Sequence, residues 1–246
     1  MIILSVGLQK SGSGLLFNLT NDMLIRGGYN DIREIRDKYS LTDFVKYYNC
    51  NIGEPTLDKI QRLTEISLSG HTFVVKTHAG INQHLIESIN QNQLKATVIF
   101  RDPRDVVISA MDHGKKIRDN KENHTFSIYT NLEITIKSVI DWLNTIITWF
   151  ELESTNILKM RYEDLIMKPE KELANLNDFL GTNINSDYQL SIFKRYDAPN
   201  LDVFAKDYLH FNEGKIGRYK STLTNDEINQ CNHAFDKYLP LLGYNL

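Results

Sequence analysis

Glycines, serines and a lysine cluster in residues 7–14, directly after the apolar run of residues 2–6. A strand that turns sharply into a helix leaves the first helical amides unpaired and directed at one point, where a phosphate can bind. Lys10 adds a positive charge to this segment, and Ser11 and Ser13 add hydroxyl donors. We therefore predict a phosphate-binding loop between a first strand and a first helix.

The spacing differs from that of the loop that binds ATP in P-loop enzymes. That motif places a lysine directly after its second glycine and then a serine or threonine that holds magnesium. Gly7 and Gly12 have the right separation, but Ser13 and Gly14 occupy the two following positions, and Lys10 lies inside the loop. An ordinary ATP-dependent kinase is therefore disfavoured. The remaining alternative is a glycine-rich turn without a ligand.

A lysine and a histidine lie at the end of a second predicted strand, residues 72–76. His78 can accept a proton from a hydroxyl or an amine near neutral pH. Lys76, two residues earlier, projects from the same face of the strand. The pair would supply a base and a cation at one site, although a histidine at a strand end can also serve packing alone.

An arginine follows the third predicted strand, residues 96–100. The guanidinium of Arg101 can bind a phosphate through two parallel hydrogen bonds. Ser109 lies about two turns into the following helix and reaches the same anion only if that helix packs alongside. The alternative for Arg101 is a salt bridge at the rim of the sheet, and Arg104 and Asp105 are expected to be solvated or capping charges.

These residues fall at strand ends in a chain that alternates strands and helices. The predicted strands are residues 2–6, 72–76, 96–100 and 156–160, and the predicted helices are residues 12–25, 103–111, 132–152 and 163–181, the last with a break near Pro169. This order predicts an α/β fold of three layers, with a central parallel sheet flanked by helices as in P-loop NTPases. Ligands bind such sheets at the carboxyl ends of the strands.

The composition is that of an ordinary globular protein. The 246 residues suit a single domain over residues 1–246, and the net charge of −3 gives no reason to expect nucleic acid as a partner. With only Cys50 and Cys231, no disulfide framework is expected, and a reducing, cytoplasmic compartment fits. No stretch approaches the ~20 apolar residues that span a bilayer. The seven histidines are scattered, so no metal site is expected.

Five segments, in order, resemble the motifs of the cytosolic-type sulfotransferases, which use 3'-phosphoadenosine 5'-phosphosulfate (PAPS). Residues 9–14 resemble the 5'-phosphosulfate loop, and residues 76–78 the segment with the catalytic histidine. Residues 101–105 with Ser109 resemble the 3'-phosphate motif. Residues 161–165 resemble the segment whose tyrosine lies near the adenine, and residues 214–220 the glycine motif that closes over the cofactor.

The resemblance implies transfer of a sulfuryl group from PAPS to a hydroxyl or amine of a small-molecule acceptor, with 3'-phosphoadenosine 5'-phosphate (PAP) as product and no metal. His78 would be the general base. Lys10 would stabilise the leaving 5'-phosphate, and Lys76 the sulfuryl group. The implied cofactor-binding residues are Lys10, Ser11, Gly12, Ser13, Gly14, Arg101, Ser109, Tyr162, Gly214, Lys215 and Gly217.

Three positions depart from the family pattern. Leu15 stands where an aromatic residue often stacks on adenine. Asn212 and Glu213 replace a basic pair that binds the 3'-phosphate, so Lys215 or Arg218 would have to compensate. The family's tryptophan after the second glycine is replaced by a tyrosine.

Two other functions stay open on the sequence: an atypical P-loop phosphotransferase and a non-catalytic nucleotide-binding module. The polar segments 112–131 and 195–217 are either solvated surface or lids, and the basic stretch 115–121 would favour an anionic or saccharide acceptor. The oligomeric state is open. Aromatic residues that would line an acceptor pocket, or belong to the core, are Phe44, Tyr47, Tyr48, Phe126, Tyr129, Phe204, Tyr208 and Phe211.

Overall fold

A computed structural model of the chain describes residues 1–196 and 214–245. Most of the predicted irregular segment 195–217 falls outside this part of the chain. The expectations for Phe204, Tyr208, Phe211, Asn212 and Glu213 therefore concern residues outside the described ranges.

Four parallel strands form one sheet in the order β2-β1-β3-β4. They are β1 (Ile2–Gly7), β2 (Phe73–Thr77), β3 (Leu94–Phe100) and β4 (Ile157–Arg161). β1 is buried along its whole length, as a strand must be when it is paired on both edges and covered on both faces. The four predicted strands are confirmed, with ends shifted by one or two residues, because each is a nearly continuous apolar run.

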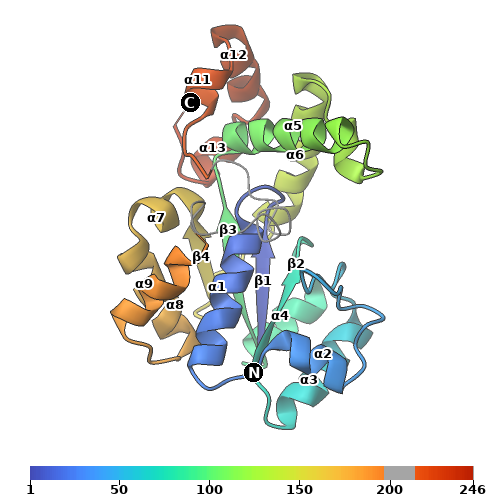
Figure 1. The fold of residues 1–246 in the computed structure, drawn as a ribbon, viewed down its shortest axis with the longest axis vertical. Coiled ribbons are helices and arrows are strands. Elements are labelled where there is room, and N and C mark those ends of the chain that lie inside the picture. The colour runs from blue at the N-terminus through green and yellow to red at the C-terminus, as the bar shows by residue number, and fades with distance from the viewer. Residues whose placement is uncertain (197–213, 246) are drawn as a thin grey trace.

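Helices surround the sheet in two groups (Figure 1). The described helices are α1 (Ser13–Arg26), α2 (Ile32–Lys38), α3 (Leu57–Leu68), α4 (Gln83–Asn90), α5 (Pro103–Asp119), α6 (Leu132–Ile147), α7 (Tyr162–Met167), α8 (Pro169–Leu180), α9 (Ser186–Lys194), α11 (Tyr219–Thr222), α12 (Asn225–Ala234) and α13 (Tyr238–Leu241), with a 3-10 turn η1 (Thr125–Ile128). In Figure 1, α5, α6 and α11 to α13 gather beyond the carboxyl ends of the strands, and the other helices flank the sheet. The predicted α/β architecture is confirmed.

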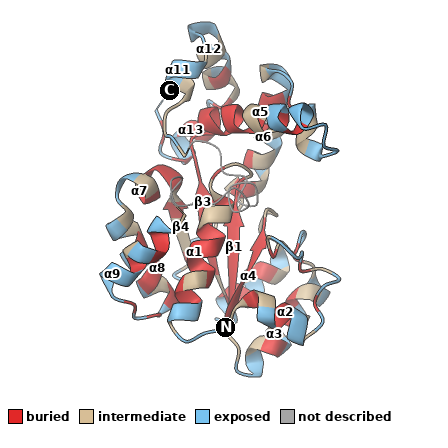
Figure 2. Cartoon of the chain, in the orientation of Figure 1, coloured by how far each residue is buried: buried red, intermediate tan, exposed pale blue. Residues whose placement is uncertain are grey.

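The core lies between the sheet and the helices that cover it (Figure 2). In α1, Leu16, Leu19 and Met23 are fully buried at the spacing of one helical face. Each such side chain contributes roughly 1.5–3 kcal/mol on burial. Within residues 1–196 and 214–245, no helix is both long and apolar enough to cross a bilayer.

Helix α5 is longer than the sequence suggested. We expected it to end near residue 111 and residues 112–131 to be a loop, but it continues to Asp119. Its buried face runs on through Ala110, Gly114 and Ile117, so the helical period does not stop where the polar residues begin. A Cβ at Gly114 would lie 2.5 Å from the carbonyl oxygen of Phe126. The glycine thus allows η1 to pack against α5.

Candidate active site

The loop between β1 and α1 is shaped by close contacts. Its residue Gly12 is the N-cap of α1 and has a φ of 88°, a left-handed conformation that glycine adopts without strain. A Cβ on Gly12 would lie 2.6 Å from the ring of Tyr162, and one on Gly7 would lie 2.6 Å from the Cβ of Ser13. Both glycines are required by these approaches. The first amides of α1 have no intrahelical acceptor and face out of the loop.

Ser11 and Lys10 take different directions within this loop. The Ser11 hydroxyl donates to the Leu8 carbonyl at 2.6 Å, and the Ser11 amide donates to the same oxygen at 3.2 Å. Ser11 is fully buried, so its hydroxyl supports the loop from inside. Lys10 has a φ of 65°, which is uncommon for a residue with a side chain. Its Nζ lies 5.7 Å from the centre of the Phe126 ring.

Two lysine ammonium groups lie at this site, and only Asp112 among the described carboxylates acts on one of them, by raising the pKa of Lys10. Among the described residues, neither Lys10 nor Lys76 forms a hydrogen bond or an ion pair through its Nζ. Burial, reinforced by the charge of Arg101, lowers the pKa of Lys10 to about 8. Burial lowers the pKa of Lys76, which is 7% exposed, to about 8 as well. Unpaired buried cations are costly, and an anionic ligand would remove that cost.

His78 is fixed in one tautomer. Its Nδ1 lies 2.5 Å from the carbonyl oxygen of Gly7. A carbonyl oxygen only accepts, so Nδ1 carries the proton and Nε2 keeps a lone pair. Burial first, and Lys76 second, lower the pKa of His78 to about 3, against the Gly7 hydrogen bond, which raises it. The segment after His78 is anchored by Trp149, whose Nε1 donates to the Ala79 carbonyl at 3.0 Å. The imidazole is therefore neutral at physiological pH.

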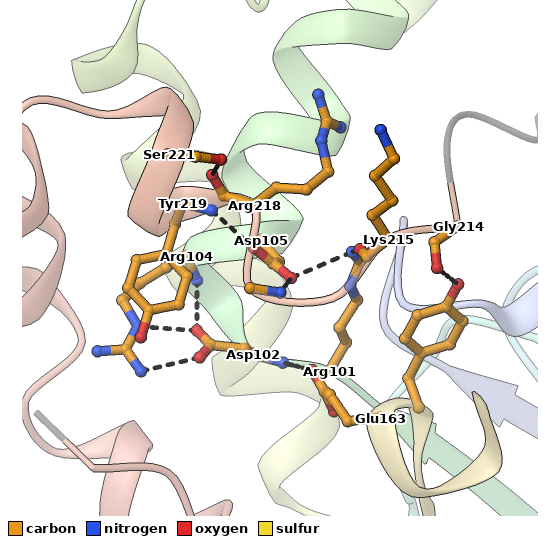
Figure 3. A network of polar contacts seen from close by, with 12 residues as sticks. Arg101, Asp102, Arg104, Asp105, Glu163, Gly214, Lys215, Arg218, Tyr219 and Ser221 are labelled. Carbon is orange, nitrogen blue, oxygen red and sulfur yellow. Dashed lines mark hydrogen bonds and ion pairs between the residues drawn. The ribbon is translucent and has the colours of Figure 1, made fainter. Parts of the chain in front are cut away.

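Residues 101–105, which follow β3 and are called the arginine turn below, place Arg101 among several partners (Figure 3). Its Nη2 donates to the Lys215 carbonyl at 2.6 Å and to Asp105 Oδ2 at 3.2 Å. Its guanidinium lies 4.7 Å from the centre of the Tyr162 ring. Its Nε is buried and has no partner among the described residues. The expected alternative, a salt bridge at the sheet rim, is present, but the buried Nε takes no part in it.

Asp105 attaches residues 214–219 to the start of α5. Its side chain is completely buried. Oδ2 accepts from the Gly217 amide at 2.7 Å, and Oδ1 accepts from the Tyr219 amide at 3.0 Å. Ser109 lies one turn further along α5 and is buried. The hydroxyl of Tyr162 donates to the Gly214 carbonyl at 3.3 Å. One tyrosine thus contacts the first loop, the arginine turn and the C-terminal glycine segment.

The motifs that lie far apart in the sequence therefore meet at the carboxyl ends of the strands. The family described as "Sulfotransferase domain" matches residues 2–243 of the chain. The chain belongs to this family.

Individual relatives of this sulfotransferase are distant. Mouse "Sulfotransferase 1A1" is 23% identical over 249 residues, covering 95% of this chain and 81% of that protein. Rabbit "Amine sulfotransferase" is 23% identical over 135 residues, covering 54% of this chain and 45% of that protein.

Solved structures share the fold. The mouse sulfotransferase SULT7A1, complexed with PAP, aligns with a TM-score of 0.63 and 18% identity over 97% of this chain and 84% of that one. Retinol dehydratase in a complex with retinol and PAP aligns with a TM-score of 0.62 and 18% identity, over 100% of this chain and 82% of that one. At these identities the likeness shows the fold alone.

Two charged side chains of this sulfotransferase lie deeper than the sequence predicts. Arg104 and Asp105 were expected to be solvated or capping, but both are buried, at 3% and 1% exposure. Arg104 donates to both carboxylate oxygens of Asp102 at 2.9 and 2.8 Å, and to Asn232 in α12 at 2.9 Å. It also lies 4.2 Å from the ring centre of Tyr219. The nearby opposite charges gave no signal of this burial, because the residues that cover the two side chains, Asn232, Gly217 and Tyr219, lie more than a hundred positions away.

The two candidates for compensating the missing basic pair have other contacts. Arg218 forms an ion pair with Asp112 at 2.8 Å. Lys215 presents its carbonyl to Arg101. At the second departure, Leu15 is partly buried and packs against the core. The Tyr162 ring, predicted near the adenine, is in contact with Arg101.

The candidate pocket aromatics separate into two places. Tyr47 and Tyr48 are exposed and pack edge to face with each other, while Phe44 lies under the cations of Lys59 and Arg62. The second group surrounds the ring that Lys10 approaches. Its members, joined by ring contacts, are His113, His124, Phe126, Tyr129 and Trp142. In the described part of the chain, no three His, Cys, Asp or Glu side chains are grouped to hold a metal ion.

Proposed function

We propose that this chain transfers the sulfuryl group of PAPS to a hydroxyl or amine of a small-molecule acceptor, with His78 as the general base. One observation carries the proposal: a neutral imidazole lies at the end of the strand that also carries a buried lysine, and among the described residues neither the imidazole Nε2 nor the ammonium has a partner. A base and a cation at one place are what group transfer to a hydroxyl requires.

The residues present fit PAPS, whose 5'-phosphosulfate and 3'-phosphate are both anionic. The first amides of α1 and the ammonium of Lys10 would hold the 5'-phosphosulfate, assisted by Gly12, Ser13 and Gly14. Ser11 would shape the loop rather than contact the ligand, because its hydroxyl donates to Leu8. The buried Nε of Arg101 and the Ser109 hydroxyl would take the 3'-phosphate, since Nε lacks a partner among the described residues.

The chain's own groups would then perform the transfer. PAPS supplies an activated sulfuryl group. The acceptor oxygen or nitrogen attacks sulfur, the bond from sulfur to the 5'-phosphate oxygen breaks, and the acceptor proton moves to His78 Nε2. Lys10 would stabilise the charge that develops on the departing oxygen, and Lys76 the charge on the sulfuryl group. No covalent bond to the protein is needed.

The acceptor would bind beside the aromatic group around Phe126. The Nζ of Lys10 lies 5.7 Å from the centre of this ring, and the rings of His113 and Trp142 pack against it. Aromatic side chains with a few polar groups are typical of small-molecule sites. Retinol dehydratase, which shares the fold, has been solved in complexes with androsterone and with retinol, and this supports a small organic acceptor here.

The decisive test compares transfer with donor binding. His78→Ala should reduce sulfuryl transfer from PAPS by about 10²–10⁴-fold and leave the affinity for PAP, measured calorimetrically, within about twofold. His71→Ala is the matched control, because His71 is a partly buried histidine at the opposite end of β2, bonded to Tyr39. It should retain both transfer and binding.

Other outcomes would replace the proposal. Equal loss of transfer and of PAP affinity would make His78 a structural residue. PAP binding without transfer to any member of a broad panel of alcohols, phenols and amines would indicate a non-catalytic nucleotide-binding module. Magnesium-dependent turnover of ATP would indicate a phosphotransferase.

A further inference from the structure

Tyr244 follows α13 and packs against the carboxyl ends of β3 and β4. Its hydroxyl donates to Glu163 Oε2 at 2.6 Å. Its ring lies 4.0 Å from the guanidinium carbon of Arg161 and packs edge to face with Phe100. The residue is 6% exposed. It lies just beyond residues 2–243, which the family match covers, so the family motifs leave this tyrosine unassigned.

Glu163 joins Tyr244 to the arginine turn. One carboxylate oxygen, Oε1, accepts from the backbone amide of Asp102 at 3.1 Å. The other, Oε2, accepts from Tyr244 and lies 3.4 Å from Arg161 Nε. Glu163 is 3% exposed, and Figure 3 shows it beneath the peptide that links Arg101 to Asp102. A buried carboxylate thus fixes the peptide plane directly after Arg101.

The phenol controls how that carboxylate is oriented. Burial, then the charge of Glu163, raises the pKa of Tyr244, so the hydroxyl stays protonated and keeps donating. Without the hydroxyl, Oε2 would keep only the longer contact to Arg161, whose side chain is one-third exposed. The carboxylate would then turn toward that guanidinium and loosen its hold on the Asp102 amide.

We propose that Tyr244 is a positioning residue for recognition of the 3'-phosphate of the donor. Through Glu163 it fixes the Arg101–Asp102 peptide, and thereby the direction of the Arg101 Nε that lacks a partner among the described residues. The inference rests on the proposed donor, PAPS. Arg101 is also held by Asp105 and by the Lys215 carbonyl, so Tyr244 refines its position rather than creating it.

The test measures selectivity for the 3'-phosphate. The dissociation constants of PAP and of 5'-AMP, which lacks the 3'-phosphate, are determined by calorimetry for each protein. Tyr244→Phe should weaken PAP binding about fivefold, as expected for the loss of one hydrogen bond, and leave 5'-AMP binding unchanged. In turnover it should raise KM for PAPS and preserve kcat. Arg101→Ala should remove most of the selectivity and leave only what the Ser109 hydroxyl contributes.

Tyr238→Phe is the control. Tyr238 is 2% exposed, belongs to the same C-terminal region, and donates its hydroxyl to Asn144, which is unconnected to the arginine turn. It should keep the ratio of the two affinities. If Tyr244→Phe is too unstable to measure, Glu163→Gln should lower the same ratio, because the glutamine keeps one oxygen for the Asp102 amide but its NH2 group cannot accept from the Tyr244 hydroxyl.

The outcomes are distinguishable. An unchanged ratio in Tyr244→Phe, or equal weakening of PAP and 5'-AMP, overturns the role of Tyr244 while the proposed donor stands. A wild-type protein that does not prefer PAP over 5'-AMP overturns the proposed donor, and the inference falls with it.

Discussion

Lys10 and Lys76 are the two lysines whose surroundings favour binding of an anion. Lys76 is buried and Lys10 is partly buried, neither ammonium forms an ion pair among the described residues, and each has a pKa of about 8. An ordinary lysine on the surface would have a pKa near 10.4. The free protein therefore holds two cations that are only marginally charged at mildly alkaline pH. A bound anion would restore their charge.

This gives a pH prediction for donor binding. Anion binding raises the pKa of both lysines from about 8 toward the ordinary lysine value. Between these values the complex binds more protons than the free protein, so PAP affinity should fall as pH rises above 8. Calorimetry at pH 8.5 in buffers of different ionisation enthalpy should register proton uptake on binding. Affinity that stays constant up to pH 10, with no proton uptake, would contradict this assignment.

The positions of candidate residues were readable from the sequence where they depend on the nearest strand end. Lys10, Lys76, His78 and Arg101 all lie at the carboxyl edge of the sheet, as predicted. The burial of Asp105 was not readable, because it results from residues 214–219 folding back onto α5. The direction of the Ser11 hydroxyl was missed for a local reason: a serine in a tight turn can bond its own backbone as readily as a ligand.

At the scale of elements, the junction of β1 and α1 depends on the absence of a side chain at Gly12. Gly12 has a φ of 88° and would place a Cβ 2.6 Å from the Tyr162 ring. Gly28, after the same helix, has a φ of 86° but nothing within 4 Å of its Cβ position. A side chain at Gly28 would therefore cause backbone strain alone, whereas a side chain at Gly12 would cause the same strain and a collision with Tyr162.

Gly28→Ala should lower the free energy of unfolding by about 1–2 kcal/mol, the cost of the left-handed conformation. Gly12→Ala should cost a further ~1–3 kcal/mol because of the collision with Tyr162, and should weaken PAP binding as the loop shifts. Urea denaturation of both variants measures the difference. Equal destabilisation by the two substitutions would show that Tyr162 does not press on the loop.

The elements themselves were well predicted where periodicity is continuous. The four strands are short apolar runs, and α1 has a clear apolar face. The end of α5 was missed because its buried face continues through only Gly114 and Ile117, which lie among many charged residues. So few apolar positions do not give a visible helical periodicity. The sequence of α5 alone also does not reveal that η1 packs against this helix.

At the scale of the whole molecule, two buried cysteines can be used to probe the packing beside the sheet and the packing beyond the strand ends. Cys50 precedes the segment that bridges to β2, and Cys231 lies in α12, beyond the strand ends. Burial raises the pKa of Cys50 to about 11 and that of Cys231 to about 12. The thiolate, which is the reactive form, is therefore scarce in the folded protein at both positions.

Alkylation of the folded protein with iodoacetamide at pH 8 should be at least about 100-fold slower than that of free cysteine, at both sites. Saturating PAP should slow Cys231 further, because Asn232 next to it is bonded to Arg104 of the arginine turn. Peptide mapping by mass spectrometry resolves the two rates, and 8 M urea (an unfolded control) should make both sites react at once. Rapid labelling of Cys231 in the folded protein would mean that α12 is not held as described.

The order β2-β1-β3-β4 has a consequence for how the molecule folds. β1 is first in the chain but central in the sheet, and the bond from His78 to Gly7 joins residues 71 positions apart. Parallel strands cannot pair through a hairpin, so β1 gains its neighbours only after long loops have closed, which is slow. The base and the phosphate loop become neighbours only in that late step. A partly folded chain therefore lacks the site, and the site forms only when the sheet is complete.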